Sequence, residues 1–214
     1  MNFNQIYCQF LNQNLNYNQA EQIIYDHTVS RKIRIELFII LYNATLNNNP
    51  LIAFKVFKEA YCMTDNIYSQ IQKSDFKFDI KLFLKDIRNK GVNLENQMNN
   101  EEKTYYDELP KSFTIYRGLS YKEHKSEDYG ISWTLDKKIA EKYIFYDKNN
   151  SEKGGLVSKN VLKKDILTIF NDGVNMEVIY LNDEKMSLTE LILFKIHKIL
   201  NWKTKLHFKY KCEK

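Results

Sequence analysis

The sequence predicts an α+β protein in which a helical first half precedes a strand-rich second half. Residues 1–108 contain one glycine and one proline, Gly91 and Pro50, whereas five of the six glycines lie between 118 and 173. Because these two residue types mark turns, long helices are favoured before residue 108 and frequent turns after it. The spacing of apolar residues also changes, from three and four in the first half to two beyond Pro110.

The helices of the first half are predicted from this spacing. Helical periodicity covers residues 20–46, 50–63, 78–91 and 94–109. Pro50 stands where the first turn of a helix accepts proline, and Gly91 stands where a helix commonly ends. We therefore expect a helical region over residues 1–107.

The second half is predicted to alternate between short strands and turns. Apolar or alternating runs predict strands at 113–118, 131–135, 156–162, 165–170 and 176–180. A polar loop separates the first two strands, and helices are expected over 137–146, with Asp136 as cap, and over 187–200. The tail 203–211 alternates strictly, and we interpret it as an edge strand whose lysines discourage aggregation. A nucleic-acid-binding ribbon is the alternative for this tail.

Composition narrows the class of protein. The chain has 214 residues, 43% of them apolar, which is enough for one large or two small domains with a core. The longest apolar run, 37–42, is too short to cross a bilayer, and no signal peptide is recognisable, so we expect a cytoplasmic protein with no membrane partner. The three cysteines and four histidines have no spacing that suits a metal site. The net charge of +5 permits an acidic partner without requiring one.

Arg117 is the first candidate functional residue. It is one of four arginines in a chain that otherwise uses lysine, and it lies on a predicted strand immediately before Gly118. The planar guanidinium can bind two oxygens of a phosphate at once, which a lysine cannot do. A glycine beside it would let a ligand approach the backbone.

Two further strands carry polar residues that suit the same site. On the second strand, alternation places Ser132 and Thr134 on one face and Trp133 on the other. On the last strand, Glu177 begins an otherwise apolar run. A carboxylate that enters a buried strand is costly unless it is hydrogen-bonded or used in chemistry.

The order of these residues resembles the arginine–serine–glutamate class of mono-ADP-ribosyltransferases. Arg117, the Ser132-x-Thr134 pair and Glu177 follow one another on successive predicted strands, and the segment ISWTLDKKIAEKYI between them is similar to small bacterial and phage members. The resemblance covers about residues 108–181, roughly a third of the chain. It implies an ADP-ribosyltransferase-like split β-sandwich in residues 108–214, with NAD as the ADP-ribose donor.

The resemblance also implies roles for individual residues. Arg117 would hold the NAD phosphates and the adjacent ribose, with Gly118 meeting the nicotinamide amide. Ser132 would brace the site, and Thr134 would shape its ribose end.

Glu177 and Tyr143 complete the implied site. Glu177 would bind the nicotinamide ribose and stabilise the positive charge that develops on the sugar as the glycosidic bond breaks. Tyr143 or a nearby aromatic residue would stack on the nicotinamide. If Glu177 does not serve, Glu184 is the second choice for the carboxylate.

One position departs from the pattern of the class. Two residues before the catalytic glutamate, members often carry glutamate or glutamine to orient the acceptor, whereas this chain has Asn175. Asparagine has the same amide as glutamine on a shorter arm and cannot act as a general base. Modification of arginine is therefore less firmly indicated, and an amide-bearing acceptor, a nucleic acid or simple NAD hydrolysis stay open.

The sequence thus predicts an ADP-ribosyltransferase that modifies a macromolecule, a protein in preference to a nucleic acid. The helical region would recognise the target or cover the NAD site. A toxin, a phage effector and an anti-defence, anti-CRISPR-like protein all stay open as its role. The alternatives are a non-catalytic binding protein with the same fold, or an RNA-binding or RNA-modifying protein.

Overall fold

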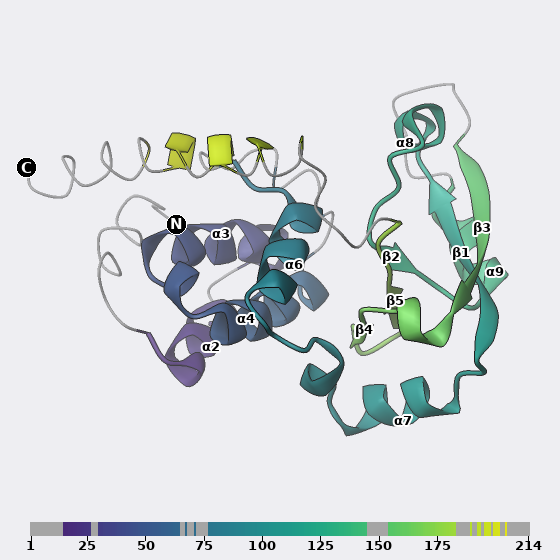
Figure 1. The fold of residues 1–214 in the computed structure, drawn as a ribbon, viewed down its shortest axis with the longest axis horizontal. Coiled ribbons are helices and arrows are strands. Elements are labelled where there is room, and N and C mark those ends of the chain that lie inside the picture. Colours follow the sequence, from purple (N-terminus) through teal and green to yellow (C-terminus); the bar gives the residue numbers. More distant parts are fainter. Residues whose placement is uncertain are drawn as a thin grey trace, which may run out of the picture. The chain divides into compact units, whose positions relative to one another are not determined.

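A computed structural model describes most of the chain in two compact units. The described residues are 15–26, 30–64, 67, 71, 77–144 and 154–182, together with positions 189, 192, 193, 195–197, 199–201 and 204. One unit, here called the helical unit, lies within residues 1–92 and 184–214. The other, the sheet unit, lies within residues 93–183 (Figure 1).

The helical unit consists of short helices joined by tight connections. They are α2 (Tyr17–Tyr25), the 3-10 turn η1 (Arg31–Ile33), α3 (Arg34–Ala44), η2 (Leu46–Asn48), α4 (Pro50–Cys62) and α6 (Ile80–Asn89). The described positions between 189 and 201 are helical as well, in agreement with the predicted helix over 187–200. The region 20–46, predicted as helical throughout, is divided, since α2 ends at Tyr25 and α3 begins only at Arg34.

Local sequence explains where these helices begin and end. The Asn16 side chain accepts a hydrogen bond from the Gln19 N–H at 3.0 Å, and the Gln19 side chain accepts one from the Asn16 N–H in return. Asn49 caps α4, whose first residue is Pro50. Gly91 follows α6 with φ +85°, the left-handed conformation that ends many helices. The predicted roles of Pro50 and Gly91 are confirmed.

Aromatic rings fill the core of the helical unit. Phe38 from α3, Phe57 from α4 and Phe83 from α6 are at most 2% exposed. Their ring centroids lie 4.9–5.6 Å apart in tilted or edge-to-face arrangements. Such pairs contribute about 0.5–1.5 kcal/mol beyond the burial of their surface.

The C-terminal helix is tied to this unit by a two-bond contact. The Asn201 side chain accepts from the Lys77 N–H at 3.0 Å and donates to the Lys77 carbonyl at 3.0 Å. The tail 203–211, predicted as an edge strand, lies outside the described residues except for Thr204, which is helical.

Among its described residues, the sheet unit contains two small antiparallel sheets and five short helical elements. In chain order these are η3 (Glu95–Gln97), α7 (Asn100–Glu108), β1 (Ser112–Leu119), α8 (Tyr121–Ser126), β2 (Ser132–Trp133), α9 (Lys137–Lys142), β3 (Gly155–Leu162), η4 (Lys163–Asp165), β4 (Thr168–Asn171) and β5 (Met176–Ile179). The first sheet pairs β1 with β3, and the second has the order β2-β5-β4. The predicted α+β class and the predicted strands are confirmed, whereas α8 forms within the stretch predicted to be a polar loop.

Within the described part of the sheet unit, a β-bridge joins the two sheets. The Tyr116 N–H donates to the Thr134 carbonyl at 2.8 Å, and the Thr134 N–H donates back to the Tyr116 carbonyl at 2.9 Å. Behind the second sheet, Trp133 is 2% exposed and packs in an apolar cluster that includes Ile115, Ile169 and Val178. The bridge therefore brings the middle of β1 beside the end of β2.

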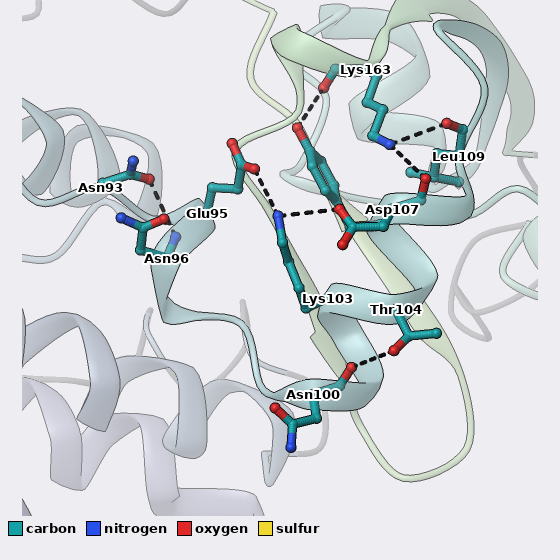
Figure 2. A network of polar contacts seen from close by, with 10 residues as sticks. Asn93, Glu95, Asn96, Asn100, Lys103, Thr104, Asp107, Leu109 and Lys163 are labelled. Atoms are coloured by element: carbon teal, nitrogen blue, oxygen red, sulfur yellow. Dashed lines mark hydrogen bonds and ion pairs between the residues drawn. The ribbon is translucent and has the colours of Figure 1, made fainter.

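Polar contacts join the carboxyl end of helix α7 to η4 within the sheet unit (Figure 2). Lys163 donates to the carbonyls of Asp107 and Leu109 at 2.9 and 3.3 Å, which satisfies acceptors that the end of a helix leaves open. The Tyr106 hydroxyl donates to the Lys163 carbonyl at 3.3 Å, and Lys103 lies between the carboxylates of Glu95 and Asp107. These contacts fix the chain just before β1.

The amino end of α7 is held by a buried carboxylate. Glu102, which is 0% exposed, accepts from the Asn99 N–H at 2.8 Å and from the Asn171 N–H at 3.0 Å. Because Asn99 caps a new helix, the segment 94–109 forms η3 and α7 rather than the single predicted helix. α7 is bonded to β4, and the two compact units divide between residues 92 and 93.

Among the described residues, no helix combines the length and the apolar character that crossing a membrane would require.

Candidate functional site

Arg117 occupies the middle of β1, opposite Val157 of β3. Its Nη1 donates to the Ser132 carbonyl at 2.6 Å, and its Nε and Nη2 both donate to Glu123 Oε1, at 3.1 and 2.8 Å. The Arg117 side chain is 14% exposed, so the guanidinium lies below the surface but within reach of it. Arg117, which stands out in the sequence because arginine is rare there, thus connects β1 with α8 and β2 through hydrogen bonds.

Ser132 and Glu177 lie on neighbouring strands of the second sheet. Ser132 of β2 pairs with Ile179 of β5, which places Glu177 two residues along the same strand. The Ser132 hydroxyl lies near enough to the Glu177 carboxyl group to lower its pKa. Trp133 points to the opposite face, into the core, as alternation predicts.

The environment of Glu177 disfavours its charge. Burial raises the pKa of the Glu177 carboxyl, and the nearby charge of Asp172 raises it further, whereas the Ser132 hydroxyl and the charge of Arg117 lower it. Burial is the largest of these effects. Among the described residues, the buried Glu177 Oε2 has no hydrogen-bond partner. An acceptor of this kind inside a protein is costly and points to a ligand that would complete it.

The structure therefore brings together the three residues singled out from separate strands. Arg117 contacts Ser132 directly, and both influence the ionisation of Glu177. A cation, a hydroxyl and a carboxyl with a raised pKa at one place are typical of sites at which charge is bound or developed.

Gly118 and Tyr143 meet at the end of α9. A Cβ on Gly118 would lie 2.1 Å from the Ala140 carbonyl oxygen and 3.0 Å from Tyr143 Cβ. The glycine is therefore required for β1 to pack against α9, which is a different reason from the predicted approach of a ligand. Tyr143 is 51% exposed, so its ring is accessible at this edge.

Thr134 and Asn175 lie at the same end of the antiparallel β2–β5 pair, just after β2 and just before β5. The Thr134 hydroxyl accepts from the Asp136 N–H at 3.1 Å, which helps to start α9. Asn175 precedes β5 in a turn closed by its own N–H, which donates to Asp172 Oδ1 at 2.6 Å. Gly173 in this turn has φ +85°. Asn175 thus stands two residues before Glu177 as the sequence indicates, in the loop that leads into the site.

Glu123 is a site residue that we did not predict from the sequence. It lies on α8, and its Oε1 accepts from the Gly130 N–H at 2.9 Å as well as from Arg117. The available signal was the Ser120-x-x-Glu123 spacing, which marks the beginning of a helix but says nothing about the partner of the glutamate.

Two other predictions concern Glu184 and metal binding. Glu184, the second choice for the carboxylate, lies outside the described residues. Within the part of the chain that is described, no group of three or more His, Cys, Asp or Glu side chains is placed to hold a metal ion.

Comparison of the chain with protein-family models, with curated proteins and with solved structures gives no match in any of the three. The proposals that follow therefore rest on the geometry of the site and on the resemblance of its motifs.

Proposed function

We propose that this protein is an NAD-dependent mono-ADP-ribosyltransferase that modifies a macromolecule. The observation that carries the proposal is the meeting of Arg117, Ser132 and Glu177, with the Glu177 Oε2 buried and unpartnered among the described residues. These residues come from β1, β2 and β5, in the order that the transferase class uses.

The residues present suit NAD as the donor. The Arg117 guanidinium is a fork that can bind the oxygens of a diphosphate, and it lies close to the carboxyl that the ribose would need. The unpartnered Glu177 Oε2 is an acceptor that a ribose hydroxyl would satisfy. NAD supplies a glycosidic bond that breaks with nicotinamide leaving with the bonding electrons.

Glu177 would act on the charge that this bond cleavage creates. The sugar becomes positively charged in the transition state, and a fixed carboxylate stabilises that state more than the ground state. The acceptor then forms a bond to the same sugar carbon and loses its proton. Because burial raises the pKa of Glu177, the positive charge of the sugar would compensate the carboxylate better than water does in the free protein.

The acceptor is a macromolecule, with a protein preferred over a nucleic acid. Asn175, two residues before Glu177, could orient an acceptor through its amide but cannot remove a proton. The helical unit would supply target recognition, since a donor site by itself does not select a target. A toxin, a phage effector and an anti-defence protein would each use such an arrangement.

One observation favours a second candidate, a non-catalytic binding protein. The hydrogen bonds of Arg117 connect β1 to α8 and β2 within the chain, so the arginine also stabilises the fold. In that case the fold would hold a partner and would neither consume NAD nor depend on the Glu177 carboxylate.

Labelling with NAD distinguishes the two candidates. The purified protein would be incubated with NAD labelled on its adenylate moiety and a cytoplasmic extract, and label on protein and on nucleic acid would be counted separately. We expect label with the wild type and a loss on the order of a hundredfold with Glu177→Gln. Glu141→Gln is the matched control, since the Glu141 side chain is 48% exposed on α9.

The result identifies which candidate fails. Equal labelling by the wild type and Glu177→Gln would contradict the assigned role of Glu177. If the wild type neither labels any acceptor, nor releases nicotinamide, nor binds NAD, the transferase proposal is overturned and the binding protein is favoured.

A further inference from the structure

Helix α8 uses its third residue differently from α7. In α7, the Asn99 side chain accepts from the Glu102 N–H, and the Glu102 carboxylate accepts from the Asn99 N–H, which completes a reciprocal capping box. In α8 the same spacing begins in the same way, because the Ser120 hydroxyl accepts from the Glu123 N–H at 3.3 Å. The Glu123 carboxylate, however, is directed toward β1 and β2.

Three donors converge on one oxygen of Glu123. Arg117 Nη2, Arg117 Nε and the Gly130 N–H lie 2.8, 3.1 and 2.9 Å from Glu123 Oε1. Hydrogen bonds between charged groups are shorter and about twice as strong as neutral ones. With the Ser132 carbonyl bound to Nη1, these contacts fix the plane of the guanidinium from two sides.

The Glu123 carboxylate could either compete with a phosphate for Arg117 or hold the Arg117 side chain in the orientation that binds the phosphate. The first role requires an element that moves away easily. The Glu123 oxygen is instead fixed by the backbone N–H of Gly130, just before β2. His124, the next residue of α8, lies directly over Gly155 of β3, where an added Cβ would come within 3.0–3.2 Å of three atoms of its ring.

The edge of the guanidinium that Glu123 binds also matters. Glu123 takes the edge formed by Nε and Nη2. A guanidinium has five N–H donors in a fork whose Nε–Nη2 edge faces Glu123, so an anion would approach the Nη1–Nη2 end, where Nη1 also donates to the Ser132 carbonyl, without displacing this carboxylate. The geometry therefore favours holding over competition.

We propose that Glu123 is a positioning residue of the donor site, which holds the Arg117 guanidinium in the orientation that binds the NAD diphosphate. This inference rests on the proposed transferase function. Glu123 would act through Arg117 without touching the substrate. It extends the site to a fourth residue, on a helix that the motif of the class does not include.

The test is NAD affinity, measured by calorimetry on the full chain without acceptor. We expect Glu123→Ala to raise the dissociation constant for NAD about tenfold, because a loose guanidinium must be ordered on binding. Glu123→Gln keeps an oxygen acceptor in place and should remain within about threefold of the wild type. Glu127→Gln, an exposed residue just after α8, is the matched control for the charge change and should bind like the wild type.

The competing role predicts a change of opposite sign. If Glu123 blocks the phosphate, removal of its charge would tighten NAD binding, so equal or tighter binding by both Glu123→Ala and Glu123→Gln overturns the inference. Should Glu123→Ala not fold, Glu123→Asp withdraws the carboxylate by one methylene and should also weaken binding. Where turnover is measurable, KM for NAD should rise while kcat changes little.

A second measurement follows Arg117 itself. The chain has four arginines, so their Nε–H signals are few in a nitrogen-resolved NMR spectrum, and Arg117→Lys assigns the relevant one. We expect slow solvent exchange of the Arg117 Nε–H in the wild type and fast exchange in Glu123→Ala. Failure of the wild type to bind NAD would overturn the proposed function, whereas NAD binding that is indifferent to Glu123 would overturn this inference alone.

Discussion

The helical unit and the sheet unit use buried side chains for different purposes. In the helical unit, Phe38, Phe57 and Phe83 meet in a close aromatic core whose contacts stabilise the fold. In the sheet unit, Arg117 and Glu177 come together beside the core, where burial disfavours the charge of the carboxyl. A residue that lowers stability at one point of a well-packed unit indicates a functional constraint there.

The largest expected effect on stability lies in the helical unit. Replacement of Phe38 by alanine removes a ring that contacts four others and leaves a cavity, so we expect a loss of about 3–5 kcal/mol in the free energy of unfolding. Chemical denaturation followed by far-UV circular dichroism measures it. Leu51→Ala, at a side chain 40% exposed on α4, is the control and should change stability by about 0.5 kcal/mol or less. A loss under about 1 kcal/mol for Phe38→Ala would contradict the importance of this core.

Gly118→Ala tests whether packing or a ligand requires the glycine. A Cβ only 2.1 Å from a backbone carbonyl forces β1 and α9 apart, so we expect a loss of roughly 1–3 kcal/mol. Gly155→Ala is the comparison, because its Cβ would meet the movable ring of His124 at 3.0 Å and should cost less. Thermal melts of both variants measure the difference. Unchanged stability with lost NAD affinity would favour the ligand explanation instead.

The smallest expected effect is a change of about tenfold in kcat/KM for each pH unit, caused by the titration of Glu177. Transfer requires the carboxylate, so kcat/KM for NAD should fall with decreasing pH below the raised pKa of Glu177. Stability should change in the opposite direction. Because the folded protein holds this proton more tightly than the unfolded chain does, Glu177 lowers stability as pH rises from the ordinary pKa of glutamate to its raised value.

The variant Glu177→Gln tests the expected pH dependence of activity and that of stability in one comparison. Relative to the wild type it should be inactive and more stable at neutral pH, and its stability advantage should shrink in acid, where the wild-type carboxyl is protonated. Melting temperatures and initial rates across the acid range measure the two trends. If kcat/KM of the wild type does not fall with decreasing pH above the ordinary pKa of glutamate, the pKa of the Glu177 carboxyl is not raised.

The strands and helices could largely be predicted from local sequence. Alternation in 113–118 and the turn at Gly173 are properties of neighbouring residues, and β1 and the β4–β5 turn lie there. Two errors lie where the spacing of apolar residues marks no boundary, since α2 ends at Tyr25 and α8 forms in a polar stretch. The bond between Glu102 of α7 and Asn171 of β4 joins distant residues, which this spacing does not show.

The candidate site, too, could be predicted from the sequence only in part. The unusual arginine, the Ser-x-Thr pair and the glutamate at the start of an apolar strand are visible in the sequence because each residue type is unexpected where it stands. Their distance from one another, the partner of Glu123 and the raised pKa of Glu177 are not visible, because pairing of β1 with β2 and of β2 with β5 creates them.

The sequence by itself determined the α+β class, most of the helices and strands, and the chemical types at the site, since periodicity and residue identity are local. Only the tertiary structure decided where the units divide, why residue 118 must be glycine and which carboxylate holds Arg117. Hydrogen bonds and burial depend on distances through space, and only the folded chain brings Arg117 and Gly130 to one oxygen of Glu123.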